Sequence, residues 1–209
     1  MIISRLIGLF AVSISLWLSA CASVPVEDDS VFDFYNTLSA AFGERDSREI
    51  FPLLSHSSVA YYDDVHSLAI SGKDIDSIEK HFVQKMHIAK YRAFLLRCLP
   101  LPSSADEALA LYVASGALDA NNFSQSVYSS HEITGNRAYV SAVADNNQEM
   151  RSYTLIWEGG GWKLDLEAVY AQLNLALAEK RKDWDLSYEE MMSAYKKSVG
   201  LPEDQIHQE

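Results

Sequence analysis

The spacing of apolar residues changes twice along this chain, and this change constrains the fold more than any other feature of the sequence. Before residue 123 the apolar side chains recur at steps of three and four, which is typical of amphipathic helices. Across residues 123–166 they alternate with polar side chains, which indicates half-buried strands, and across 168–200 the helical spacing returns. The pattern predicts an α+β fold with one block of strands between helical segments.

Short signals divide these segments into elements. Turn residues predict a meander of about four antiparallel strands, with turns at 135–136, 146–147 and 159–161. Capping residues and apolar spacing predict helices over 31–42, 46–54, 74–96, 104–115, 168–182 and 187–200. The segment 58–62 is expected to be extended and to pair with 68–71.

The first twenty residues have the composition of an export signal. One positive charge, Arg5, precedes an unbroken run of apolar or hydroxyl-bearing residues over 6–18, and small residues follow. This order is typical of a secretory signal peptide, and the run is too short to span a membrane comfortably. Residues 1–20 are therefore expected to be removed during export by the Sec pathway.

The next feature is a single cysteine at the end of this signal. Leu18-Ser19-Ala20-Cys21 resembles the lipobox of bacterial lipoproteins. The resemblance implies that Cys21 carries a diacylglyceryl group and that residues 21–30 form an acylated tether to the membrane. Ala22 resembles the residue found there in lipoproteins sorted to the outer membrane, so the expected location is the cell envelope, at the periplasmic face of a Gram-negative outer membrane. An uncleaved anchor and a signal peptide cut near Ala22 remain the alternatives.

The net charge argues against a nucleic-acid-binding protein, and the cysteine content argues against a disulfide-stabilised one. The chain has 17 Lys plus Arg against 29 Asp plus Glu, a net charge of −12, which removes the attraction that drives binding to nucleic acid. Besides Cys21 the sequence contains one cysteine, Cys98, so lipidation of Cys21 leaves no internal disulfide. A buried, inert Cys98 is favoured over an activated thiol, because no local motif supplies a base.

Four short segments resemble the nuclear transport factor 2-like superfamily, which includes SnoaL-like and ketosteroid-isomerase-like proteins. They lie at 59–66, 70–75, 135–140 and 161–165. The resemblance implies a cone-shaped, curved antiparallel sheet with N-terminal helices packed on its concave face. The domain would cover 31–167 with an insertion at 98–122, followed by a C-terminal helical extension at 168–202 and a loose tail at 203–209. A homodimer is common in that superfamily and stays open here.

The same resemblance implies which residues would form a catalytic site. Asp63 falls where the isomerase-like branch has its general base, Tyr35 is a loose match for the helix-borne donor, and Tyr153 lies near the place of the late-strand acid. Such a base with two donors could stabilise an enolate. A pocket in this domain would be lined by Tyr61, Asp64, His66, Phe82, Leu155 and Trp157. Acidic residues at a strand end also bond turn amides, and a structural role is the simpler interpretation of Asp63.

No sequence motif for a nucleotide, a serine hydrolase or a metalloprotease occurs. The spacing of His56, Asp63, Asp64 and His66 matches no recognisable metal site, so neither a metal nor a cofactor is expected. The leading hypothesis is a lipid-anchored envelope protein that binds a small apolar ligand or a protein partner without catalysis. The alternatives are an isomerase-like enzyme with Asp63 as base and a structural subunit of an envelope or secretion complex.

Anchoring makes a direct prediction. Cys21→Ser removes the acylated sulfur, and because two or three acyl chains hold a protein on a bilayer almost permanently, the variant should move from the membrane to the soluble fraction. Fractionation of cells expressing each form measures this. A variant that stays as membrane-bound as the parent contradicts the lipidation of Cys21.

Overall fold

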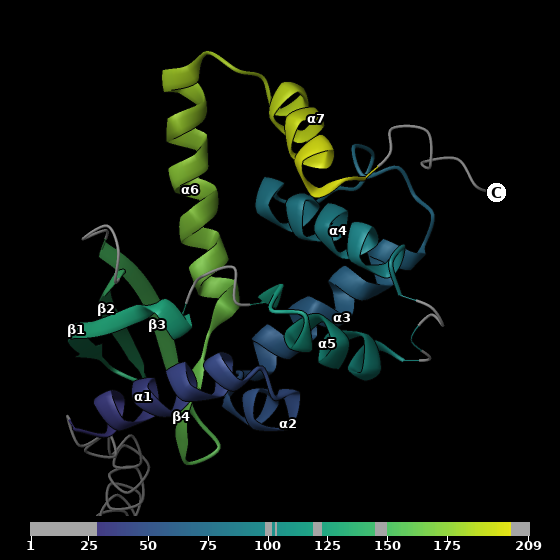
Figure 1. Ribbon diagram of the computed structural model, residues 1–209. Coiled ribbons are helices and arrows are strands. Elements are labelled where there is room, and N and C mark those ends of the chain that lie inside the picture. The colour runs from purple at the N-terminus through teal and green to yellow at the C-terminus, as the bar shows by residue number, and fades with distance from the viewer. Residues whose placement is uncertain (1–28, 99–101, 103, 119–122, 145–149, 202–209) are drawn as a thin grey trace, which may run out of the picture.

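Seven α-helices and one antiparallel sheet make up the part of the chain that the structure describes, so the α+β class is confirmed (Figure 1). The structure is a computed structural model, and it describes residues 29–98, 102, 104–118, 123–144 and 150–201. The predicted signal peptide, Cys21, the turn at 146–147 and the tail at 203–209 lie outside these residues. In the described helices, none is long and apolar enough to cross a membrane.

The elements follow the order of the predicted segments. The first group comprises α1 (Asp29–Glu44), α2 (Ser47–Ile50), a 3₁₀ turn (Phe51–Leu53), α3 (His56–Ile70), α4 (Phe82–Leu95) and α5 (Ala105–Ala114). A second 3₁₀ turn (Phe123–Gln125) leads into β1 (Ser126–Thr134), β2 (Arg137–Ala144), β3 (Met150–Glu158) and β4 (Gly161–Leu164). The chain ends with α6 (Leu166–Trp184) and α7 (Tyr188–Val199).

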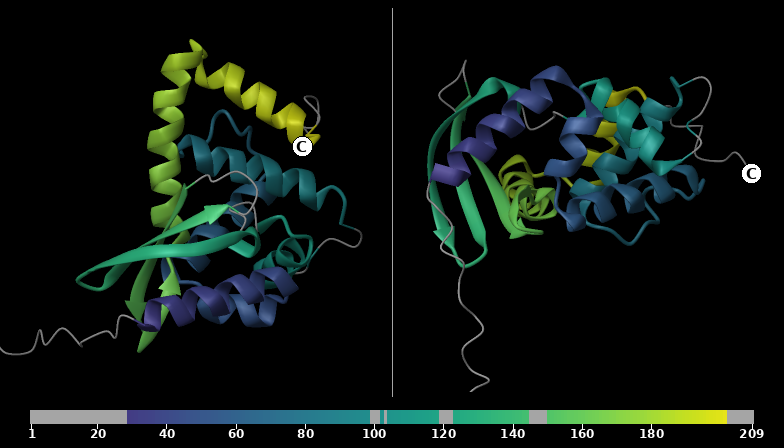
Figure 2. Two further views of the ribbon diagram at one scale, coloured as in Figure 1. Left: turned by 60° about the vertical axis from the view of Figure 1, so that its left-hand side comes forward. Right: turned by 90° about the horizontal axis from the view of Figure 1, so that it is seen from below.

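The four strands form the predicted meander, in the order β1-β2-β3-β4. Alternate side chains of β2, Ala138, Val140 and Ala142, are buried on one face, as period-two spacing requires. Helix α1 packs on this face, where the ring of Tyr35 lies 6.0 Å from that of Tyr153. The view from below shows α1 crossing the strands (Figure 2).

The predicted strand at 58–62 and its pairing with 68–71 are wrong, because both segments belong to α3. The β-branched and aromatic residues of this segment favoured a strand, but Ser55 caps a helix here by accepting a hydrogen bond from the amide of Ser58 at 3.1 Å. Four residues of α3 at helical spacing face the core: Ser58, Tyr62, Val65 and Ala69. The residues at 59–66 that carried part of the family resemblance are therefore helical.

Helix α4 begins later than predicted, at Phe82 rather than near residue 74. Ile75 and Ile78 are nevertheless buried, because the turn before the helix folds them into the core. The α4 amide of Val83 donates to the Asn174 side chain of α6 at 2.9 Å. A residue distant in sequence therefore helps to fix where α4 starts.

Helix α6 leaves the sheet, and α7 returns over α4, so that the two form a helical hairpin (Figures 1 and 2). Met192 of α7 and Leu201 after it are buried. Lys196 of α7, which is also buried, pairs with Asp76 at 2.8 Å. The predicted capping box of this helix is confirmed, with reciprocal bonds between Ser187 and Glu190.

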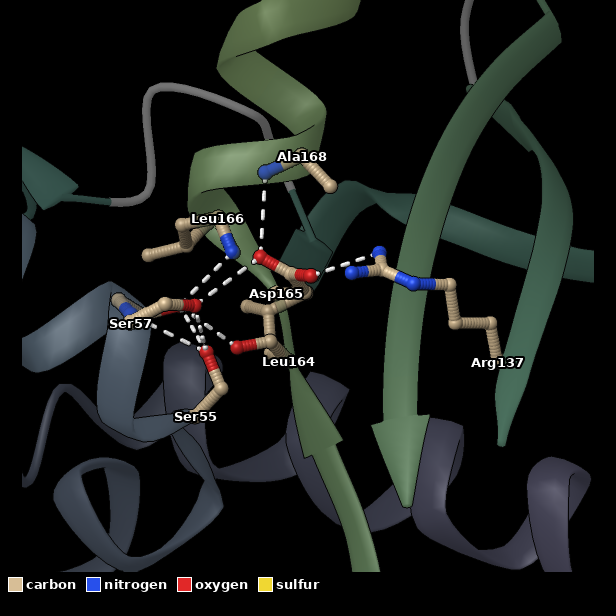
Figure 3. A network of polar contacts seen from close by, with 8 residues as sticks. Ser55, Ser57, Arg137, Leu164, Asp165, Leu166 and Ala168 are labelled. Carbon is tan, nitrogen blue, oxygen red and sulfur yellow. Dashed lines mark hydrogen bonds and ion pairs between the residues drawn. The ribbon is translucent and has the colours of Figure 1, made fainter. Parts of the chain in front are cut away.

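The sheet and the helices are joined at the start of α6 by a buried carboxylate (Figure 3). Asp165 is 3% exposed and caps α6 by accepting from the amide of Ala168 at 3.1 Å. Its second oxygen accepts from Arg137 of β2 at 2.9 Å. The hydroxyl of Ser57 of α3 lies 3.3 Å from the capping oxygen. One side chain thus contacts a strand and two helices.

A serine hydroxyl completes this junction. The Ser58 hydroxyl donates to the carbonyl of Leu164 and accepts from the amide of Leu166, both at 2.8 Å. It also lies 2.7 Å from the hydroxyl of Ser55. Hydrogen bonds therefore hold the start of α3 against the turn of chain between β4 and α6.

The junction makes a prediction about stability. Asp165→Ala removes the helix cap and the partner of Arg137, and should lower the free energy of unfolding by about 2–4 kcal/mol. Asp165→Asn keeps a capping oxygen and should lose clearly less. Urea denaturation of the three forms checks this, and an equal loss in both variants would show that capping contributes nothing.

Candidate functional site

The structure does not bring the three predicted catalytic residues together. Asp63 lies on the exposed side of α3. Tyr35 and Tyr153 lie under the sheet, where the Tyr35 hydroxyl donates to the carbonyl of Ser126 at 3.1 Å. Burial raises the pKa of Tyr35, so that hydroxyl stays neutral. Asp63 was expected to act as a base because it would follow a strand, but it lies within helix α3.

The predicted pocket residues divide into two groups. Leu155 is fully buried in the core under the sheet, and Trp157 packs edge-on against Trp162. Four others lie on the helices: Tyr61, Asp64 and His66 on α3, and Phe82 at the start of α4. Of the six, Phe82 lines the two cavities described below, and the other five line neither of these two.

The helices instead enclose a group of rings that sequence reasoning missed as a unit, the tyrosine–histidine cluster. Its members are Tyr61, Tyr62, His87, Tyr112 and Tyr170, from α3, α4, α5 and α6. The Tyr61 hydroxyl lies 2.7 Å from Nδ1 of His87, and the hydroxyls of Tyr62 and Tyr170 lie 2.7 Å apart. The rings of His87 and Tyr170 are 4.3 Å apart. The helical spacing of these residues could have indicated burial, but not that the four helices meet there.

Desolvation decides the charge of this cluster. It lowers the pKa of His87 to about 3, with a smaller effect from the nearby Lys90 ammonium. Burial also raises the pKa of Tyr61, Tyr62 and Tyr112. At neutral pH the imidazole and the phenols are therefore uncharged, and the cluster is a hydrogen-bonded packing unit between helices rather than an acid–base pair.

A cavity lies between α4, α6 and α7, and we call it the hairpin cleft. It is open to solvent and has a volume of about 750 Å³, within the size range of small-molecule sites. Its apolar lining consists of Phe82, Ala171, Leu175, Tyr188 and Met192. Its polar lining consists of Asp76, Lys80, His81, Lys85, Asn174 and Glu189.

Several charges of the cleft already have partners. Lys80 pairs with Asp64 at 2.8 Å, and Asp64 also accepts from Gln84 at 2.6 Å. The Lys85 ammonium donates to the backbone carbonyl of Asp76 at 2.9 Å. These contacts hold the polar side chains at one wall and leave the apolar wall between α6 and α7 accessible.

A second, smaller cavity of about 310 Å³ lies between the same three helices, and we call it the second lobe. Phe82 lines both cavities, and its ring lies 5.3 Å from that of Tyr188. The other lining residues are Met86, Leu177, Trp184, Leu186, Met191, Ala194, Tyr195 and Ser198. The helical spacing of α6 and α7 was predicted from the sequence, but the packing of these helices around α4, which creates both cavities, depends on tertiary contacts.

Neither a metal site among the described residues nor similarity to a known protein indicates the function. Within the described residues, no group of three or more His, Cys, Asp or Glu side chains is placed to hold a metal ion. Comparison with protein-family models, curated proteins and solved structures found no match.

The cluster predicts an acid-sensitive stability. The pKa of His87 is about 3 in the folded protein and near 6.5 when unfolded, so between these values the unfolded state binds more protons. Stability should therefore fall as the pH drops below about 6.5, by up to about 1.4 kcal/mol per pH unit from this group. Urea denaturation from pH 7 to 4.5 measures the slope.

His87→Gln removes the titrating ring and should flatten this slope. The matched control is His81→Gln, since the side chain of His81 at the start of α4 is exposed. A slope that stays steep in His87→Gln and flattens in His81→Gln would contradict the assignment.

Proposed function

We propose that this protein is a lipid-anchored envelope protein that binds a small, predominantly apolar molecule in the hairpin cleft, without transforming it. The observation that carries the proposal is the accessible apolar wall of Phe82, Leu175 and Tyr188 between α4, α6 and α7. Soluble proteins rarely leave such a surface open unless it binds something. The lipobox resemblance at Cys21 supplies the proposed anchor.

The chemistry of the lining favours binding over catalysis. Its residues include one histidine, His81, and no serine, threonine or cysteine. The Lys80 ammonium is held by a carboxylate, and Lys85 by a backbone carbonyl. Covalent or acid–base catalysis needs a nucleophile or base with a positioned partner, which this set of side chains does not offer.

The position of the cleft suits an anchored receptor. The start of α1 and the connection between α6 and α7 lie at opposite ends of the molecule (Figures 1 and 2). A tether attached before α1 would therefore leave the hairpin pointing away from the bilayer. The tether of about eight residues reaches at most about 30 Å, so the domain would stay close to its membrane.

A structural role in an envelope complex remains the second candidate, because the hairpin exposes large apolar side chains. The exposed fractions are 71% for Leu175 and 55% for Trp184. Under this alternative a protein would cover the hairpin. Deletion of the hairpin cannot test it cleanly, since Tyr170 and Met192 belong to the core and their loss should unfold the domain.

Filling the cleft tests the leading proposal. Ala171 lines the cleft and is exposed, so Ala171→Trp should fill the space without disturbing the core and should weaken binding of the neutral probe N-phenyl-1-naphthylamine by about tenfold. Ala176 is also exposed on α6 but lines neither cavity. Fluorescence titration measures the affinity.

Ala176→Trp is the matched control and should bind the probe like the parent. If the parent does not bind the probe, or if both variants bind it unchanged, the cleft is not a ligand site.

A further inference from the structure

The two cavities beside Phe82 differ in chemistry. The hairpin cleft has a polar wall that includes Lys85 and Asn174, whereas eight of the nine residues around the second lobe are apolar. Phe82 is half-buried and lines both cavities, so the two meet at this residue. A ligand that occupied both would contact polar groups at one end and a mainly apolar lining at the other.

The apolar lobe is suited to a flexible chain. Met86 and Met191 line it, and methionine side chains adapt to ligands of irregular shape because they are unbranched and polarizable. Trp184 lies at the distal end of α6 and is 55% exposed. A hydrocarbon chain in this lobe would cover part of that indole ring.

The polar end holds two ammonium groups and two carboxylates, and one of the ammonium groups is not used in an ion pair within the described residues. The carboxylate of Asp76 is already paired with Lys196, and Glu189 lies in the first turn of α7, where the helix dipole stabilises its negative charge. The ammonium of Lys85 bonds a neutral carbonyl, not a carboxylate, within the described residues. Lys85 can therefore pair with a ligand carboxylate at the polar wall without breaking an ion pair.

We infer that the hairpin cleft and the second lobe together take a single-chain amphiphile with an anionic head group, of the fatty-acid class. The carboxylate pairs with Lys85, and the hydrocarbon chain passes Phe82 into the second lobe. This inference rests on the proposed function and names the class of ligand for the same site.

Competition with the neutral probe tests the head group. Dodecanoate and dodecanol have the same chain and differ in charge, and dodecanoate should displace N-phenyl-1-naphthylamine with about fivefold higher affinity. Lys85→Gln should abolish this preference. Lys73→Gln, a matched change at an exposed lysine outside both cavities, should keep it.

A chain-length comparison tests the second lobe. Ala194 lines this lobe and is exposed, so Ala194→Trp should fill it without unfolding the domain. The variant should weaken dodecanoate about tenfold and leave hexanoate nearly unchanged, because a short chain ends before the lobe.

The outcomes separate this inference from the proposed function. If the probe binds but dodecanoate and dodecanol compete equally, the anionic head group is wrong while the cleft remains a ligand site. If Ala194→Trp weakens both acids equally or neither, the route past Phe82 is wrong. Failure of the probe itself to bind the parent overturns both proposals.

Discussion

The buried carboxylate of Asp165 joins the sheet to the helices, and the arrangement of both depends on it. The first amides of a helix have no partner within the helix. Because the chain passes directly from β4 to α6, the amides at the start of α6 need partners from elsewhere. Asp165 bonds one of these amides while its other oxygen holds Arg137 of β2. Ser58 satisfies the adjacent carbonyl and amide from α3. The carbonyl of Leu164 and the amides of Leu166 and Ala168 are therefore satisfied where the two parts of the apolar core meet.

This junction also explains why the helices meet as they do. The starts of α3 and α6 are fixed to the same turn of chain, so the two helices are held close from their first residues (Figure 3). Tyr61 and Tyr62 of α3 then lie against Tyr170 of α6, and His87 of α4 joins them. The resulting cluster is uncharged at neutral pH, which lets polar side chains act as packing groups in the helical core.

Local physics made much of the fold predictable from the sequence. The meander follows from alternation and turn residues, and the caps at Ser104 and Ser187 follow from hydroxyl groups that satisfy helix amides. The segment 58–62 was mispredicted because its residues favour strands locally, although Ser55 caps a helix there. The hydroxyl of Ser58 also bonds residues 164 and 166, which no local pattern shows. The site was less predictable, because it too depends on contacts between residues that are distant in the sequence. Phe82 was identified, but the cleft requires α6 and α7 to cross over α4, and no local pattern encodes that crossing.

A small tilt at the start of α6 would move the far end of this helix by a larger distance. Helix α6 has 19 residues and is about 28 Å long, with its first turn fixed at Asp165, its middle lining the hairpin cleft and its far half lining the second lobe. A tilt of about 10° at the root would displace the far end by about 5 Å, about one helical turn. The ion pair between Lys196 and Asp76 opposes such a tilt, because it ties α7 to the segment before α4. The width of the cleft is thus set at two points, the first turn of α6 and the ion pair between Lys196 of α7 and Asp76.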